Sequence, residues 1–173
     1  ERLEKGLPKV RLAAAGALAR IGGDGDRSQA LQTLEHALKE ESGDEWAAAA
    51  RTLGDLGDLS APAVPTVCQL LQAALRAEED MRANACADLL ERVRSRPDIA
   101  VPALTEALAS RQRFVRASAA SALAAFRSDA APAIPALVQA LQDKDEALRA
   151  WAAHVLRGIG PAAAAAVPAL VAR

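Results

Sequence analysis

The chain has 173 residues, of which 51% are hydrophobic, only 2% are aromatic and 25% are charged, with a formal net charge of −1. The scarcity of aromatic and β-branched runs argues against a β-sandwich or β-barrel, and the near-neutral charge provides no global field that would attract nucleic acid or an acidic membrane. No stretch approaches the ~20 continuous apolar residues of a membrane-spanning helix, so we expect no membrane partner.

The chain opens with a partial unit, residues 1–25, in which Leu7 to Gly22 is predicted to be a lone second helix. A Gly/Asp-rich turn is expected at residues 22–26. We interpret it as a connector, because a calcium loop needs more oxygen ligands at alternating positions and a later bidentate Glu. Since the N-terminus resembles the end of an earlier helix and the C-terminus stops inside one, we expect the chain to be part of a longer repeat protein.

Four full units follow, at residues 28–58, 61–95, 97–128 and 131–160, and a second partial unit occupies residues 161–173. An aliphatic-Pro pair opens the first helix of a unit and recurs at a nearly constant spacing, at Val64-Pro65, Val101-Pro102, Ile134-Pro135 and Val167-Pro168. Proline suits the first helical turn, where its missing N–H would be unpaired anyway. The period falls within the roughly 20–50 residues that are typical of repeat architectures, so it predicts a solenoid.

The second helix of each unit ends in a Leu-x-x-apolar pattern, which we expect to form a continuous core ladder. The pattern occurs at Leu18/Ile21, Leu53/Leu56, Leu90/Val93, Leu123/Phe126 and Leu156/Ile159. In the unit at 131–160, Asp145 is predicted to cap the second helix and Gly160 to end it, as Gly22 and Gly57 do in their units. The predicted fold is all-α, a right-handed α-α superhelix of about four full two-helix repeats with a partial repeat at each end, forming one domain over residues 1–173.

An apolar-Arg pair starts the second helix in several units, and the stretch from Val115 to Leu123 resembles the HEAT-like repeat of the phycobilisome-lyase type. Leu148 to Gly160 and Ala133 to Leu137 resemble it too. The resemblance implies a structural ladder in which the Arg of each pair bonds to an Asp of the turn. The matching arginines are Arg11, Arg82, Arg116 and Arg149, with Asp80 and Asp143 or Asp145 as candidate partners. Trp46 replaces one ladder Arg, and Arg111-Gln112-Arg113 replaces expected acids.

Second helices line the concave face of such stacks, and we expect a partner to bind there. The candidate residues are Arg51, Asp55, Asn84, Asp88, Ser118, Ser121, Trp151 and His154. Trp151 and His154 are three apart and therefore share a helix face, and Trp is enriched among binding hot spots. Packing of Trp151 over the small alanine faces of neighbouring helices is the alternative. Trp46 is interpreted as structural.

No catalytic constellation is visible. His36 and His154 lie on different units without a carboxylate or cysteine at motif spacing, and there is no Tyr and no Cys-x-x-Cys. Cys68 and Cys86 are predicted to be reduced core residues rather than a disulfide. We therefore expect a protein that is not an enzyme, uses no cofactor and no metal, and is cytoplasmic.

The favoured function is a non-enzymatic scaffold or adaptor that binds a protein or peptide on its concave face. Self-association is an open possibility, because the unit at 28–58 is acidic while the region around 97–128 is basic. Two alternatives come from the resemblance: a bilin lyase-like subunit that handles a tetrapyrrole chromophore, and a HEAT-like DNA-binding protein. The near-neutral charge and scarce aromatics disfavour nucleic acid.

Overall fold

A computed structural model of the chain describes residues 2–39 and 43–166, and it is helical throughout those ranges apart from short turns. The elements are α1 (Arg2–Ile21), α2 (Asp24–Lys39), α3 (Gly43–Leu56), η1 (Gly57–Ala63), α4 (Val64–Ala77), α5 (Asp80–Val93), α6 (Pro97–Ala107), α7 (Arg113–Phe126), η2 (Arg127–Ala133), α8 (Ile134–Ala140), α9 (Glu146–Ile159) and η3 (Gly160–Ala166). The Val167-Pro168 pair lies outside the described residues.

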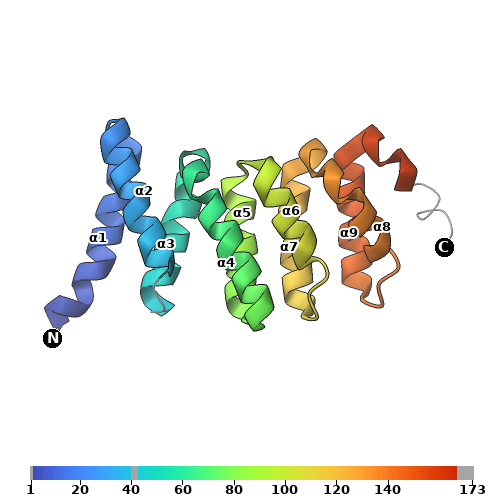
Figure 1. The fold of residues 1–173 in the computed structure, drawn as a ribbon, viewed down its shortest axis with the longest axis horizontal. Helices are drawn as coiled ribbons and strands as arrows, with labels where there is room; N and C mark the ends of the chain where they lie inside the picture. The colour runs from blue at the N-terminus through green and yellow to red at the C-terminus, as the bar shows by residue number, and fades with distance from the viewer. Residues whose placement is uncertain (1, 40–42, 167–173) are drawn as a thin grey trace.

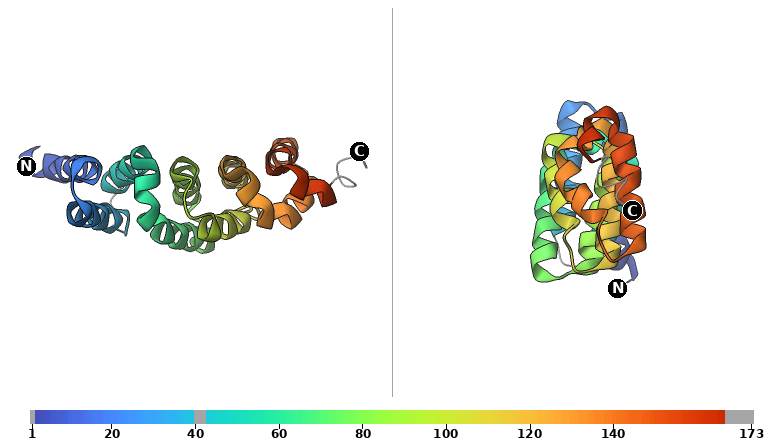
Figure 2. Two further views of the ribbon diagram at one scale, coloured as in Figure 1. Left: turned by 90° about the horizontal axis from the view of Figure 1, so that it is seen from above. Right: turned by 90° about the vertical axis from the view of Figure 1, so that its right-hand side faces the viewer.

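The helices form two rows that follow one another along the long axis (Figure 1). One row holds α1, α3, α5, α7 and α9, and the other holds α2, α4, α6 and α8. Each helix contacts mainly its partner and its neighbours in the row, as α5 does with α4, α3 and α7. The array bends so that the row with α3, α5, α7 and α9 lies on the inner side (Figure 2). The fold is an α-solenoid, as the repeat predicts.

The core is a ladder of leucines at one helical position. Leu53, Leu90, Leu123 and Leu156 are each at most 2% exposed. Small side chains surround the ladder, and α7 buries Ala119, Ala120 and Ala122 beside Leu123. Because alanine adds little bulk, adjacent helices of the inner row approach closely, and each unit buries its apolar stripe on the next.

The first helices start in two different ways. Val64-Pro65 and Ile134-Pro135 open α4 and α8, each after a 3₁₀ segment. The Val101-Pro102 pair instead lies inside α6, which already begins at Pro97. In this unit no 3₁₀ segment precedes the first helix, so the helix extends further toward the N-terminus.

The N-terminal unit differs from the prediction in its turn. Residues 24–26 belong to α2, which begins at Asp24, so the connector is shorter than the predicted 22–26. Acidic side chains in the first turn, from Asp24 and Asp26, favour the positive end of the helix. Gly22 is not among the glycines with positive φ, which are Gly57 and Gly160. Since α1 ends at Ile21, Gly22 does follow the helix end as predicted, but without the positive φ of Gly57 and Gly160.

The assignment of Leu18 and Ile21 to the core ladder is also wrong, since they are 47% and 84% exposed. The buried line of α1 runs instead through Leu12, Ala15 and Ala19. In the described part of the chain α1 packs mainly on α2 and α3, and it comes close to α3 at Gly16, where a Cβ would lie 2.6 Å from Thr52 Cγ2. Leu18 and Ile21 lie outside this contact, whereas Leu123 of α7 also has the first helix α6 against it.

The two cysteines, on α4 and α5, are buried and form no disulfide with each other, as predicted. Burial raises the pKa of both thiols to about 12, because the thiolate would lose its hydration. Both therefore stay protonated at neutral pH and act as small apolar residues.

Candidate partner-binding surface

The eight candidate residues of the concave face lie on the four helices α3, α5, α7 and α9 of the inner row. Four of them are exposed: Arg51, Asp55, Asp88 and His154. The others are half-buried: Asn84, Ser118, Ser121 and Trp151. All eight are at the surface, and they differ in the hydrogen bonds and ion pairs that they form with neighbouring helices.

Several of these residues connect neighbouring helices. Arg92 of α5 forms an ion pair with Asp55 of α3. Ser118 Oγ of α7 donates a hydrogen bond to Asn84 Oδ1 of α5 at 2.7 Å, and Asn84 Nδ2 donates to Asp88 at 3.4 Å. These polar side chains join α3, α5 and α7 across the concave face. Part of the hydrogen-bonding capacity of these side chains is therefore already used by contacts within the chain.

The end of the concave face at α9 is more open. The rings of Trp151 and His154 meet edge to face, with centroids 5.8 Å apart, and Arg157 Nη2 lies 3.0 Å from His154 Nδ1. A shallow depression of about 390 Å³ is lined by both residues and by Ala147 and Ala150. Trp151 also packs against the core. The indole of Trp151 thus packs against the core on one side and faces the depression on the other.

A second depression, of about 230 Å³, lies between α3 and α5. Its lining combines small and charged side chains: Trp46, Ala47, Ala50, Arg51, Ala85, Asp88, Leu89 and Arg92. Trp46 packs against the core, and within the part of the chain that the structure describes its buried Nε1 has no hydrogen-bond partner. Its ring fills the place of a missing ladder Arg, which is a structural role.

Two large apolar residues on this surface were missed by the sequence reasoning. Met81 is 85% exposed and Phe114 is 69% exposed. They are the second residues of α5 and α7, which start one repeat apart at Asp80 and Arg113, so they hold equivalent positions on adjacent helices. Aligning the units from their ends instead of from the apolar-Arg pairs would have revealed them. Exposed apolar side chains on neighbouring helices are typical of contact surfaces.

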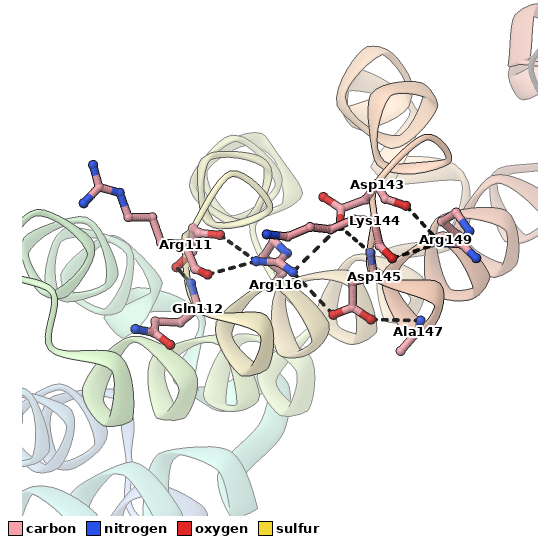
Figure 3. Close-up of polar contacts among 9 residues, drawn as sticks. Arg111, Gln112, Arg116, Asp143, Lys144, Asp145, Ala147 and Arg149 are labelled. Carbon is pink, nitrogen blue, oxygen red and sulfur yellow. Dashed lines mark hydrogen bonds and ion pairs between the residues drawn. The ribbon is translucent and has the colours of Figure 1, made fainter.

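The turns between first and second helices carry the arginine contacts that the resemblance implies. Arg116 of α7 is nearly buried, with 10% of its side chain exposed. Its Nη1 donates to the carbonyls of Ser110 (3.1 Å) and Arg111 (3.0 Å) in its own turn. Its Nη2 lies 3.3 Å from Asp145 and 3.8 Å from Asp143, in the turn of the next unit (Figure 3). One guanidinium thus joins two consecutive turns.

Arg149 occupies the same place in α9 and donates from Nη1 to the carbonyls of Asp143 (3.0 Å) and Lys144 (3.2 Å). Asp145 also accepts from the backbone N–H of Ala147 at 3.0 Å, which is the predicted cap of α9. Arg11 is more exposed, and its ion pair with Glu45 of α3 is long, at 4.0 Å. The contacts are therefore strong at one end of the solenoid and weak at the other.

Arg82 does not hold the ladder position. It is the third residue of α5, which matches Val115 in α7, and the fourth residue, Ala83, matches Arg116. Arg82 Nη2 donates to the carbonyl of Leu38 at 3.3 Å, and its Nη1 pairs with Glu79 at 3.4 Å rather than with Asp80. The apolar-Arg pair Met81-Arg82 is thus out of register with the others by one position.

Among the side chains that the structure describes, no group of three or more from His, Cys, Asp or Glu is arranged to hold a metal ion. None of the described helices is both long enough and apolar enough to cross a lipid bilayer.

Comparison with known proteins identifies the repeats. The family model of HEAT repeats matches residues 68–157 and 101–173, and the model of the PBS lyase HEAT-like repeat matches residues 10–40. A search of curated proteins finds no match. Among solved structures the chain is similar to two engineered proteins of the Northeast Structural Genomics Consortium.

The first of these structures is 23% identical with a TM-score of 0.60, covering 92% of this chain and 77% of that one. The second is 22% identical with a TM-score of 0.63, covering 96% of this chain and 52% of that one, so this chain spans about half of its length. Likeness at these identities shows the fold alone.

Proposed function

The chain belongs to the HEAT-repeat family, and we propose that it is a non-enzymatic scaffold that binds a protein or peptide segment on its concave face. Function in a solenoid comes from the surface that its stacked helices present, since each unit contributes a few exposed side chains to a long groove. The match to the PBS lyase HEAT-like repeat covers a single stretch, residues 10–40, and describes a repeat rather than an activity.

The observation that carries the proposal is the composition of the inner surface between α5 and α9. It combines small residues with isolated large apolar ones: Met81 and Phe114 are exposed, and Trp151 with His154 lines a depression whose other walls are Ala147 and Ala150. A bound segment would place its own side chains over the alanines and anchor on the aromatic rings. Such buried aromatic anchors supply most of the affinity in protein interfaces.

The depressions on the inner face favour an extended or helical protein segment over a small molecule. They are shallow and separate, at about 390 Å³ beside Trp151 and about 230 Å³ between α3 and α5. Small ligands are bound in clefts that enclose most of their surface. A chain segment can instead cross both depressions and gain contacts along the whole row.

The proposal is tested by selecting peptides that bind the intact chain from a displayed random library, and by capturing proteins from the native cell extract. Binding is then compared with the Trp151→Ala/His154→Ala variant. Loss of a hot-spot pair is expected to weaken binding at least about 30-fold, which corresponds to about 2 kcal/mol. A control variant, Gln69→Ala/Gln139→Ala, changes exposed residues of the outer helices α4 and α8 and should bind as the parent does.

Circular dichroism must show that both variants remain helical. Equal binding by the parent and by the folded Trp151/His154 variant would place the partner elsewhere on the solenoid. If the only protein captured is the chain itself, the surface serves self-association instead.

A further inference from the structure

A cavity in the described part of the chain lies away from the aromatic end, between the turn that joins α4 to α5 and the turn that joins α6 to α7. Its volume is about 340 Å³. Its polar lining comprises Arg76, Glu78, Asp80, Glu106, Ser110, Arg111 and Gln112, and Ala83 lies among them. The aromatic anchors of the proposed scaffold do not line this cavity.

The cavity occupies the position of a missing ladder arginine. Helices α5, α7 and α9 begin at the evenly spaced residues Asp80, Arg113 and Glu146. Their fourth residues, Ala83, Arg116 and Arg149, are therefore equivalent. In the next unit the guanidinium of Arg116 lies between its own turn and the following one. At the equivalent point here, the side chain of Ala83 ends at Cβ and the space stays open.

The walls of the cavity hold the sequence positions that surround Arg116 in the next unit, although α4 continues to Ala77 and Glu78 has a φ of 56°, so the α4–α5 turn differs in shape from the α6–α7 turn. Glu78 corresponds to Arg111, whose carbonyl accepts from Arg116, and Ser110 and Gln112 correspond to Asp143 and Asp145. In Figure 3 the side chains of Arg111 and Gln112 point to the side opposite Arg116, which is the side of this cavity. The same molecule therefore shows which chemical group fits between two such turns: a guanidinium.

The lining is suited to a cation that only donates hydrogen bonds. Three carboxylates, from Glu78, Asp80 and Glu106, stand against two guanidinium groups, from Arg76 and Arg111. The pair between Arg111 and Glu78, at 3.4 Å, has 89% and 74% of its side chains exposed, so it is weak and easily exchanged. Ser110 and Gln112 add neutral oxygen acceptors. A planar guanidinium presents five N–H donors in a fixed fork, whereas an ammonium offers three donors around a compact charge, so the guanidinium can reach oxygens on both turns.

From this geometry we propose that the cavity is a receptor for an arginine side chain of the bound partner, which completes the ladder from outside. The inference rests on the proposed scaffold function and specifies one feature of its partner. Met81 directly follows the lining residue Asp80, and Phe114 lies two residues after the lining residue Gln112, so an apolar residue next to the arginine would meet them. The expected recognition element is an arginine flanked by an apolar side chain.

The test uses the whole chain and a minimal probe, N-acetyl-arginine-N-methylamide, followed by ¹H–¹⁵N NMR. The matched probe is the citrulline analogue, which has nearly the same shape but no charge. We expect saturable arginine binding in the range of about 1–10 mM, with shifts confined to the amides around Glu78, Ala83 and Ser110–Gln112. The citrulline probe should bind at least about 10-fold more weakly.

Two variants locate the site. Ala83→Arg supplies the guanidinium from within the chain and should abolish binding of the probe, whereas Ala73→Arg, at an exposed position of α4, should not. Gln112→Asp restores the acid that Arg116 meets in the next unit and should tighten arginine binding at least about 3-fold. Gln112→Asp decides the question on its own if Ala83→Arg does not fold.

Equal shifts from arginine and citrulline, binding that persists in folded Ala83→Arg, or no gain from Gln112→Asp would each overturn the proposal. These outcomes are independent of the scaffold test, because none of the residues changed here belongs to the Trp151/His154 end. Peptide binding could be lost in the Trp151/His154 variant but unaffected by Ala83→Arg. That result would support the scaffold function and contradict the arginine receptor.

Discussion

Arg127 and Gly160 hold the same position, immediately after the second helix of successive units, and both have positive φ. The values are φ 51° and ψ −124° for Arg127, and φ 80° and ψ −142° for Gly160. Glycine adopts this region readily, while a residue with a Cβ is strained there. Arg127 keeps the conformation because α7 and η2 are both packed on their neighbours.

Arg127→Gly should therefore raise the free energy of unfolding by about 1 kcal/mol, since relief of strain outweighs the added freedom of the unfolded chain. Gly160→Arg, the reverse change at the equivalent place, should lower it by about the same amount or more. Urea denaturation followed by circular dichroism measures both. A lower urea midpoint for Arg127→Gly would show that the contacts of the Arg127 side chain stabilise the fold by more than its positive φ destabilises it.

The two leucines Leu18 and Leu123 share one place in the sequence repeat but have different environments. Leu123 is fully buried and Leu18 is 47% exposed. Leu123→Ala should cost about 2–5 kcal/mol, because it removes apolar contacts and leaves a cavity. Leu18→Ala should cost less than about 1 kcal/mol. Comparable losses would mean that α1 packs with its Leu18 face inward, as the repeat pattern alone suggests.

That contrast shows what the repeat could and could not predict. Spacing of the aliphatic-Pro and Leu-x-x-apolar patterns predicts the two-row solenoid and the buried ladder of Leu53, Leu90, Leu123 and Leu156. It cannot predict the exposure of Leu18, because α1 packs on α2 and α3 through Leu12, Ala15 and Ala19 instead. Periodicity reports which residues are equivalent, whereas burial depends on what packs against each one.

The register of α5 shows a second limit of prediction from the repeat. Met81-Arg82 has the composition of an apolar-Arg pair, but the step from Met81 to Val115 is one position longer than the step from Leu90 to Leu123. Alignment from the fully buried Leu90 places Ala83, not Arg82, in the ladder. Pairs across the concave face, such as Ser118 with Asn84, depend on the offset between packed helices and have no signal in a single sequence.

Arg116 should matter more to stability than any other arginine whose ladder contacts are described. Arg116→Met removes a nearly buried charge and leaves two turn carbonyls and the Asp143–Asp145 pair of carboxylates without their shared donor. Breaking such an arrangement should cost about 2–4 kcal/mol. Arg149→Met is the matched control: among the described residues Arg149 bonds to carbonyls of its own turn, so its loss should cost about 1 kcal/mol.

Thermal or urea unfolding of the two variants, at low and at high salt, checks this order. The Arg116 effect should persist at high salt, because pairs shielded from solvent are screened weakly. An equal cost for both variants would show that the contact between consecutive turns adds nothing beyond the local hydrogen bonds.

The buried thiols should make the solenoid sensitive to alkali. Burial raises the pKa of Cys68 and Cys86 from 9.0 to about 12. A raised pKa in the folded state means that the contribution to stability is complete below about pH 9 and is lost as the pH rises toward 12, because only the unfolded chain releases the proton. At about pH 10.5 the loss should be about 2 kcal/mol for each thiol, at ~1.4 kcal/mol per pH unit.

The measurement is the urea unfolding free energy at about pH 8 and about pH 10.5, for the parent and for Cys68→Ala/Cys86→Ala. The variant starts less stable, since two buried side chains are truncated, but it should lose less stability between the two pH values than the parent does. Subtracting the two pH dependences removes the contribution of lysine titration, which both proteins share. Parallel losses in the two proteins would mean that the thiols ionise as readily in the folded chain as in the unfolded one, which contradicts their burial between α4 and α5.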